Sequence, residues 1–306
     1  MGINVVSLFD GASMGRVALD RLGIEVDNYY ASEIDKWAMI VSKNNYPDIK
    51  QIGDITKLQL LPKDFPKIDL VMGGSPCQGF SFAGKQLNFE DSRSKLFFDF
   101  VRIYKMLKKK NPDIKFLLEN VKMKKEYQDV ISEIMEVEPI EINSSLVSAQ
   151  NRKRLYWTNI ESVEQPEDRE IYLKDIIESG VVDRDKSYCI DANYFKGGNL
   201  KQYYEKSRRQ LVFGCAMCGR YDENKKVYQT IEFNKTEKSN CLTSVVKDSL
   251  LFNEYGFRKL TPIECERLQA LPDNYTEGVS DSQRYKMLGN GWTVDVIAHI
   301  LRNINK

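Results

Sequence analysis

The sequence predicts an α/β protein with a doubly wound, mostly parallel β-sheet and a smaller second domain inserted before its C-terminal end. Between residue 3 and about residue 157, short apolar runs alternate with longer amphipathic segments, as in parallel β-α-β units. After residue 160 this periodicity weakens and turn-forming residues accumulate, and helical spacing returns near residue 260. We therefore expect a discontinuous main domain at 1–160 and 258–306, and a second domain at 161–257.

Four continuous apolar runs are the strand candidates. They read INVVSLF, YYASEI, IDLVMGG and IKFLLENV, at 3–9, 29–34, 68–74 and 114–121. Runs without polar alternation are typical of strands that are buried on both faces. We therefore expect parallel strands with helices covering each side of the sheet.

Helical spacing is clearest at 95–110, where apolar side chains recur three and four positions apart and lysines occupy the C-terminal end. A shorter helix is expected at 16–23, after a turn that contains glycine. Near the end of the chain, 260–272 and 293–304 again have helical spacing. These last helices are expected to complete the main domain.

The composition indicates the cellular compartment of the protein and excludes some classes of catalytic site. No stretch of the 306 residues approaches the ~20 consecutive apolar residues of a membrane span, and the N-terminus enters a strand-like run without a targeting segment. We expect a soluble, cytoplasmic protein whose six cysteines remain reduced. The single histidine, His299, excludes Ser-His-Asp triads and sites with several histidine ligands.

Polar residues at the ends of the predicted strands are candidates for ligand binding, because doubly wound sheets bind ligands beyond the carboxyl ends of their strands. The first strand runs into FDG at 9–11 and then Gly15, where backbone could approach a ligand closely. Glu33 ends the second strand, at about the interval where nucleoside-binding folds place an acid against ribose hydroxyls. Asp54 could accept a hydrogen bond from an adenine amino group, or it could cap the helix that comes after it.

Cys77 is the candidate nucleophile. It follows a proline in the loop 73–81, which has glycine on both sides of the cysteine. A thiol reacts as the thiolate, with a free pKa of about 8.5, and Arg152 and Arg154 could supply the positive setting that favours this form. Glu119 ends the neighbouring strand and could act as an acid or hydrogen-bond donor, or form a buried salt bridge.

Nine sequence blocks occur in a fixed order along nearly the whole chain. They are SLFDGASMG, the acids Glu33 and Asp54, GGSPCQGFS, EDSRSKLFFDF, LLENV, SAQNRKRLYW, LTPIECERLQALP and MLGNGWTVDVI. In residues and order they resemble the cytosine-carbon-5 DNA methyltransferases. The block with Trp292 is similar to the vertebrate de novo enzymes, whereas the loop with Cys77 has the bacterial form, so we expect a prokaryotic or phage enzyme.

The resemblance implies a Rossmann-like class I methyltransferase with a smaller target-recognition domain at 161–257. It implies S-adenosylmethionine as the methyl donor and S-adenosylhomocysteine as the product. The residues implied to bind the donor are Phe9, Asp10, Gly11, Gly15, Glu33, Ile34, Asp54, Ile55, Pro76, Leu96, Asn290 and Trp292. The residues implied to surround the target cytosine are Cys77, Glu119, Arg152 and Arg154.

The resemblance also implies covalent catalysis on a nucleotide that is swung out of the duplex. Cys77 would attack ring carbon 6, so that carbon 5 can accept the methyl group. Glu119 would hold ring nitrogen 3 and the exocyclic amine, Arg154 would contact the carbonyl oxygen, and Arg152 would order the loop. Double-stranded DNA is the expected partner and a restriction endonuclease a candidate companion, while the oligomeric state is left open.

A basic stretch is the candidate for contacts with DNA phosphates. Residues 196–226 carry eight basic and three acidic side chains, which could bind DNA or form a solvated face. The residues expected to contact DNA are Ser81, Lys85, Arg208, Arg209 and Arg220.

Three alternatives compete with this interpretation. A tRNA cytosine methyltransferase of the same fold carries a Cys-Phe-Thr motif, and none of the six cysteines here is followed by Phe-Thr. A non-catalytic DNA-binding partner would usually have lost the nucleophile or the carboxylate, and both are present. Zinc could bind four of the six cysteines, although we expect no metal; these four are Cys189, Cys215, Cys218 and Cys241.

Overall fold

The structure of the protein is a computed structural model. It describes residues 2–58, 65–75, 95–197, 200–213, 215–221, 227–233 and 257–304. For 215–221 and 227–233 it gives the course of two strands.

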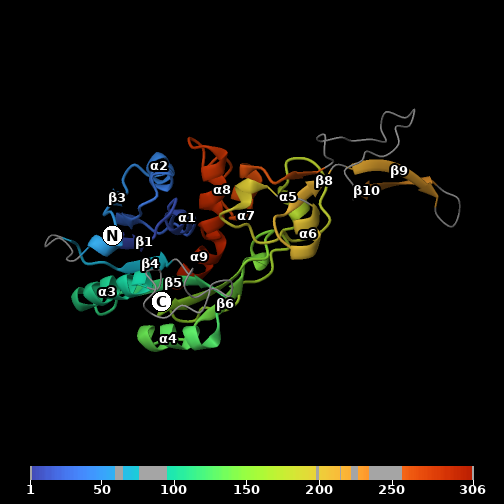
Figure 1. Cartoon of the computed structure of the whole chain (residues 1–306). Helices are drawn as coiled ribbons and strands as arrows, with labels where there is room; N and C mark the ends of the chain where they lie inside the picture. Colours follow the sequence, from blue (N-terminus) through green and yellow to red (C-terminus); the bar gives the residue numbers. More distant parts are fainter. Residues whose placement is uncertain are drawn as a thin grey trace.

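A seven-stranded sheet forms the centre of the described chain, with strand order β3-β2-β1-β4-β5-β7-β6 (Figure 1). The pairs from β3 to β5 are parallel, whereas β7 is antiparallel to both β5 and β6. The expected doubly wound, mostly parallel sheet is therefore confirmed. The strands are β1 (Ile3–Leu8), β2 (Val26–Ser32), β3 (Lys50–Gln51), β4 (Leu70–Gly74), β5 (Lys115–Val121), β6 (Ile140–Asn143) and β7 (Lys153–Thr158).

The four predicted apolar runs form β1, β2, β4 and β5. In β1 the neighbours Val5 and Val6 are both wholly buried, because successive side chains of a strand point to opposite faces and both faces here are covered. Val5 belongs to the apolar cluster that includes α1, α2 and α9, and Val6 to the cluster that includes α3 and α4. The short strands β3 and β6, and β7 with its charged first residues, are not among the predicted runs.

The helices occupy the predicted segments and several further ones. Thr261 and Glu264 form a capping box at the start of α7, with Pro262 in the first turn, which explains why that helix begins there. Among the described helices, none has the length and apolar character that crossing a membrane requires. The helices of the main domain are α1 (Met14–Arg21), α2 (Lys36–Asn45), η1 (Ile55–Lys57), α3 (Lys95–Lys110), α4 (Lys125–Met135), η2 (Ser144–Leu146), α7 (Pro262–Leu268), α8 (Asp281–Asn290) and α9 (Val294–Leu301).

The C-terminal helices pack on the N-terminal part of the chain. Arg21 at the end of α1 forms an ion pair with Asp295 at the start of α9. Arg169 binds the other oxygen of the same carboxylate, at 2.7 Å. Residues from both ends of the sequence also belong to one apolar cluster.

The region after residue 160 has a mixed character. Leu173 and Ile190 belong to the same apolar cluster as α7, α8 and α9, whereas Tyr203 packs with β8 and β11 in a separate small cluster. The β9–β10 hairpin extends away from the central sheet (Figure 1). Apolar packing thus continues across residue 160, and the proposed division at 161–257 stays a prediction. The elements of this region are α5 (Leu173–Ile176), η3 (Tyr194–Lys196), α6 (Leu200–Lys206), β8 (Leu211–Phe213), β9 (Cys215–Tyr221), β10 (Val227–Phe233) and β11 (Phe257–Lys259).

Candidate active site

A cavity of about 400 Å³ lies at the carboxyl edge of the sheet. It is lined by the ends of β1, β2, β4 and β5, by β7 and by the link between α8 and α9. Gly15 does not line it, and Pro76 lies outside the described residues. The predicted donor-binding residues that do line it are Phe9, Asp10, Gly11, Glu33, Ile34, Asp54, Ile55, Leu96, Asn290 and Trp292.

Glu33 joins the two turns that come after β1 and β2. One carboxylate oxygen accepts from the backbone N–H of Gly11 at 2.7 Å, and the other accepts from Ile34 at 2.7 Å and Asp35 at 2.8 Å. Gly11 has a φ of 59°, a left-handed conformation that suits glycine. A carboxylate has about four lone-pair positions, so Glu33 retains one acceptor position toward the cavity.

The carboxyl group of Asp10 is held by the protein itself. Its oxygens accept from the hydroxyls of Ser13 at 2.5 Å and Tyr29 at 2.7 Å. Burial raises the pKa of Asp10 to about 6, against the lowering effect of these hydrogen bonds. Asp10 therefore fixes the turn before α1, and the cavity wall is built on that turn.

Asp54 caps the short helix η1, as one of the two sequence-based interpretations predicts. Its Oδ1 accepts from the backbone N–H of Thr56 at 2.9 Å and from the hydroxyl of Thr56 at 2.8 Å. These hydrogen bonds lower the pKa of Asp54. The same residue lines the cavity, so capping and ligand binding are compatible here.

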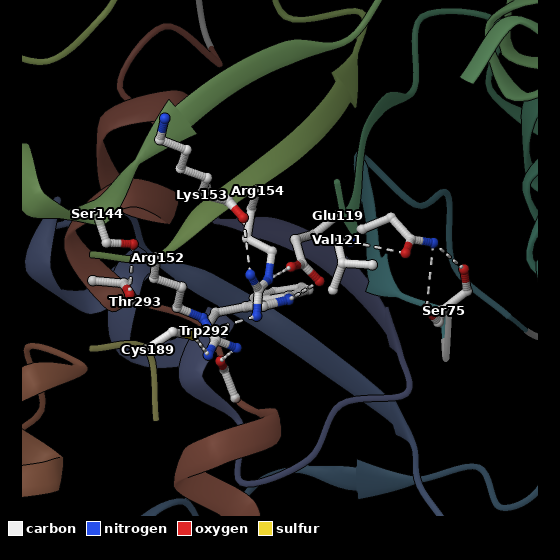
Figure 2. A network of polar contacts seen from close by, with 12 residues as sticks. Ser75, Glu119, Val121, Ser144, Arg152, Lys153, Arg154, Cys189, Trp292 and Thr293 are labelled. Atoms are coloured by element: carbon white, nitrogen blue, oxygen red, sulfur yellow. Dashed lines mark hydrogen bonds and ion pairs between the residues drawn. The ribbon is translucent and has the colours of Figure 1, made fainter. Parts of the chain in front are cut away.

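Glu119 and Arg154 form an ion pair beside the cavity (Figure 2). Arg154 Nε lies 3.0 Å from Glu119 Oε1, and the Trp292 indole Nε1 donates to Glu119 Oε2 at 3.3 Å. Glu119 as a whole is 8% exposed. Burial by itself lowers the pKa of Arg154, but Glu119, Cys189 and Tyr156 together outweigh burial, and the net pKa is raised. The two paired side chains both line the cavity.

Arg152 lies deeper and binds backbone carbonyls. Its guanidinium donates to the carbonyl oxygens of Ile190 at 3.2 Å, Gly289 at 3.2 Å and Gly291 at 2.8 Å. Burial, and then the charge of Arg154, lower the pKa of Arg152. The resemblance implies that Arg152 orders a loop. In the structure, Arg152 links the start of β7 to Ile190 and to the segment 289–291.

Several site residues are missed by sequence reasoning. The Cys189 sulfur lies 3.3 Å from Arg152 Nη1 and 3.9 Å from Arg154 Nη2, whereas the sequence marks Cys189 only as a candidate metal ligand. Lys286 binds Asp35 at 2.6 Å, and both residues line the cavity. No local motif announces either contact, because the partners are separated by 35 to 251 residues.

Described residues on each side of the segment with the candidate nucleophile line the cavity. Cys77, Ser81 and Lys85 lie outside the described residues. Ser75, the last described residue before them, and Leu96, close to the first one after them, both line the cavity. Asn120 Nδ2 donates to Ser75 Oγ at 3.2 Å and so fixes the end of β4 against the end of β5.

Two of the predicted DNA-contacting arginines have partners within the chain. Arg208 binds Asp191 at 2.7 Å in an exposed ion pair, and Arg209 donates to the carbonyl oxygen of Gly197 at 2.8 Å. Arg220 lies on β9. Among the described side chains, no group of three His, Cys, Asp or Glu residues could hold a metal ion.

Comparisons with known proteins show the family. The family model for C-5 cytosine-specific DNA methylase matches residues 3–306. Type II methyltransferase M1.ScrFI of Lactococcus lactis subsp. cremoris is 30% identical over 315 residues, which cover 96% of this chain and 75% of that protein. Type II methyltransferase M.HhaI of Haemophilus parahaemolyticus is 30% identical over 335 residues, which cover 99% of this chain and 94% of that protein.

Solved structures support the fold. A mutant of Spodoptera frugiperda DNMT2 aligns over 100% of both chains with a TM-score of 0.63 and 20% sequence identity. The family expected from the nine sequence blocks is confirmed by the match over residues 3–306. The chain belongs to the family of C-5 cytosine-specific DNA methylases.

Proposed function

We propose that this chain transfers a methyl group from S-adenosylmethionine to carbon 5 of cytosine in duplex DNA. The observation that carries the proposal is the ion pair of Glu119 with Arg154, 3.0 Å apart, in a cavity that Glu33 also lines. One cavity is thus lined by Glu119, whose carboxylate suits the polar edge of a cytosine, and by Glu33, whose carboxylate suits ribose hydroxyls.

The cavity fits the proposed methyl donor. Its volume of about 400 Å³ lies within the ~300–1,000 Å³ of small-molecule sites. Glu33 retains an acceptor position for a ribose hydroxyl, and Ile34, which is 76% exposed, offers an apolar surface to a purine ring. S-adenosylmethionine would supply a methyl group activated on a sulfonium. The cavity residues proposed to bind it are Phe9, Gly11, Glu33, Ile34, Asp54, Ile55, Leu96, Asn290 and Trp292, with Asp10 supporting the first turn.

Cytosine carbon 5 is a weak nucleophile, so covalent catalysis is proposed. The Cys77 thiolate forms a bond to carbon 6, and the electron pair of the 5,6 double bond moves to carbon 5, while a proton taken up from water is shared between ring nitrogen 3 and the Glu119 carboxylate. Carbon 5 accepts the methyl group as the bond from methyl to sulfur breaks and S-adenosylhomocysteine leaves. Carbon 5 then loses its proton to a base or water, and the proton at ring nitrogen 3 is released. The bond between Cys77 and carbon 6 breaks in the same elimination, which restores both the thiolate and the aromatic ring.

The two arginines are proposed to divide the remaining tasks. Arg154, paired with Glu119 in the cavity, contacts the cytosine carbonyl oxygen. Arg152 keeps β7 in place through the carbonyl groups of Ile190, Gly289 and Gly291. Because the donors are fixed before the reaction, they stabilise developing charge without reorganising.

The region 161–257 is proposed to recognise DNA. Swinging a nucleotide out of the duplex costs a few kcal/mol, and phosphate contacts have to offset it. Arg208, Arg209, Arg220, Lys85 and Ser81 are the proposed contacts, and binding should weaken steeply with salt. We also propose a companion restriction endonuclease, because both relatives carry the name Type II methyltransferase.

Methyl transfer to defined substrates tests the proposal. Purified protein is incubated with methyl-labelled S-adenosylmethionine and duplex DNA, and with RNA in parallel, and the modified base is identified. We expect 5-methylcytosine in DNA only. Bisulfite sequencing of DNA from expressing cells then locates the recognised site. Absence of methylcytosine in DNA that contains every short sequence would contradict the proposed function.

Two variants test the covalent route. Cys77→Ala should abolish methyl transfer and also the covalent complex with DNA that carries 5-fluorocytosine, where the elimination step is blocked. Glu119→Gln should lose about 10²- to 10⁴-fold in rate, the usual range for a positioned acid or base. Donor binding should survive in Cys77→Ala. Normal turnover by that variant would rule out the assigned nucleophile.

A further inference from the structure

The indole of Trp292 lies where the donor cavity meets the carboxylate of Glu119. Its ring lines the cavity, and its Nε1 donates to Glu119 Oε2 at 3.3 Å (Figure 2). The other carboxylate oxygen, Oε1, is bound by Arg154 Nε at 3.0 Å. The carboxylate is therefore oriented by two donors that come from different elements, β7 and the link between α8 and α9.

Two glycines make room for this contact. A β-carbon at Gly74 would lie 2.8 Å from Glu119 Oε2 and 2.9 Å from Trp292 Nε1, closer than such carbons approach other atoms. A β-carbon at Gly15 would lie 2.6 Å from Cε of Met72 and 3.2 Å from Cζ3 of the indole ring. The ring therefore lies close to the backbone at the end of β4 and at the start of α1.

The residues on each side of Trp292 are also held by hydrogen bonds. Arg152 Nη2 donates to the carbonyl oxygen of Gly291 at 2.8 Å, and the hydroxyl of Thr293 donates to Gln269 Oε1 at 2.8 Å. The residues beside Trp292 and its ring are therefore both held, and the N–H group donates to Glu119. An indole that served only as an apolar wall would not need this alignment.

We propose that Trp292 is a positioning residue for Glu119: its N–H orients the carboxylate toward the cytosine while its ring forms part of the donor cavity. This inference rests on the proposed function. It adds a contact between the residues proposed to bind the donor and those proposed to bind the cytosine. Indole nitrogen is a donor only, so the contact selects an orientation in which Oε2 presents a lone pair. The shape of the donor cavity and the orientation of the Glu119 carboxylate then both depend on the Trp292 side chain.

The contact can be tested without any methyl transfer. The chain has three tryptophans, Trp37, Trp157 and Trp292, so protein labelled with ¹⁵N-tryptophan gives three indole signals that Phe variants assign. We expect Glu119→Gln to shift the Trp292 indole signal. The Trp157 signal, whose N–H donates to Ser132 at 3.0 Å, should stay in place as the internal control. An unmoved Trp292 signal would overturn the inference, and this result does not depend on Trp292 variants folding.

Kinetics then test the consequence for catalysis. Trp292→Phe keeps a ring and removes the N–H, so kcat should fall about tenfold to a hundredfold, the usual worth of a hydrogen bond to a charged group. KM for S-adenosylmethionine should change much less. The matched control, Trp37→Phe, should keep both constants. A raised KM with an unchanged kcat would reduce Trp292 to a cavity wall. If the unaltered protein methylates no cytosine, the proposed function fails, while the indole signal still decides the contact.

Discussion

Arg154 and Glu119 are diagonal neighbours on adjacent antiparallel strands. Glu119 on β5 stands opposite Tyr156 on β7, and Arg154 precedes Tyr156 by two residues, on the same face of the sheet. Their side chains are 15% and 11% exposed, and Nε lies 3.0 Å from Oε1. A long cation can reach a diagonal partner across a sheet, so the register of β7 decides that this pair forms.

Removing Arg154 should destabilise the fold as well as the reaction. Arg154→Ala leaves the Glu119 carboxylate buried and unpaired, which typically costs about 3–5 kcal/mol. Denaturant unfolding measures this, with Arg208→Ala as the matched control. The pair of Arg208 with Asp191 is exposed, and its loss should cost at most about 1 kcal/mol. Equal losses from the two variants would contradict a buried, charged pair at Glu119.

Arg152→Lys should loosen the C-terminal part of the site although the charge is retained. A lysine ammonium cannot match the planar fork that reaches three carbonyl groups, and buried acceptors without partners cost about 1–3 kcal/mol each. We expect lower stability and faster hydrogen exchange at 289–291. Arg302→Lys, at an exposed position, should change stability by less than about 0.5 kcal/mol. Unchanged exchange at 289–291 would argue against the role of Arg152.

Glu33→Ala should weaken binding of S-adenosylmethionine by about tenfold or more, because a hydrogen bond to a charged group is worth about 1.5–3 kcal/mol. The substitution also leaves the N–H groups of Gly11, Ile34 and Asp35 without their acceptor, which loosens the cavity wall. Isothermal titration calorimetry measures the affinity, and Glu25→Ala, at an exposed position of the same region, is the control. Wild-type affinity in the Glu33 variant would remove its proposed role.

Asp10 should make stability depend on pH in the mildly acidic range. Burial raises its pKa from 3.8 to about 6, so the folded state binds this proton more tightly than the unfolded chain. The ionised carboxyl therefore opposes folding above about pH 6, and this cost disappears as the pH falls toward about 4. Relative to Asp10→Asn, which cannot titrate, the wild-type free energy of unfolding should rise by up to about 1.4 kcal/mol per pH unit on lowering the pH across this window. Urea titrations measure it, and a constant difference between the two proteins would contradict the raised pKa.

The sequence predicted the parts of the fold that local patterns encode. Continuous apolar runs indicated β1, β2, β4 and β5 because strands buried on both faces need apolar side chains on both faces. The strand β7 was not among the predicted strands, since its first residues, Lys153 and Arg154, are charged. Its antiparallel pairing with β5 depends on a contact between segments that local periodicity cannot report.

The sequence by itself determined the family, through its ordered blocks, and it indicated which strands end in acids and which cysteine is the candidate nucleophile. Tertiary structure decided how each polar group is used. Asp10 is occupied by Ser13 and Tyr29, Cys189 meets two arginines, and Trp292 meets a carboxylate 173 residues away. The physical reason is that hydrogen bonds and ion pairs depend on distance and direction between side chains, and the packing of the sheet and helices fixes these across large separations in sequence.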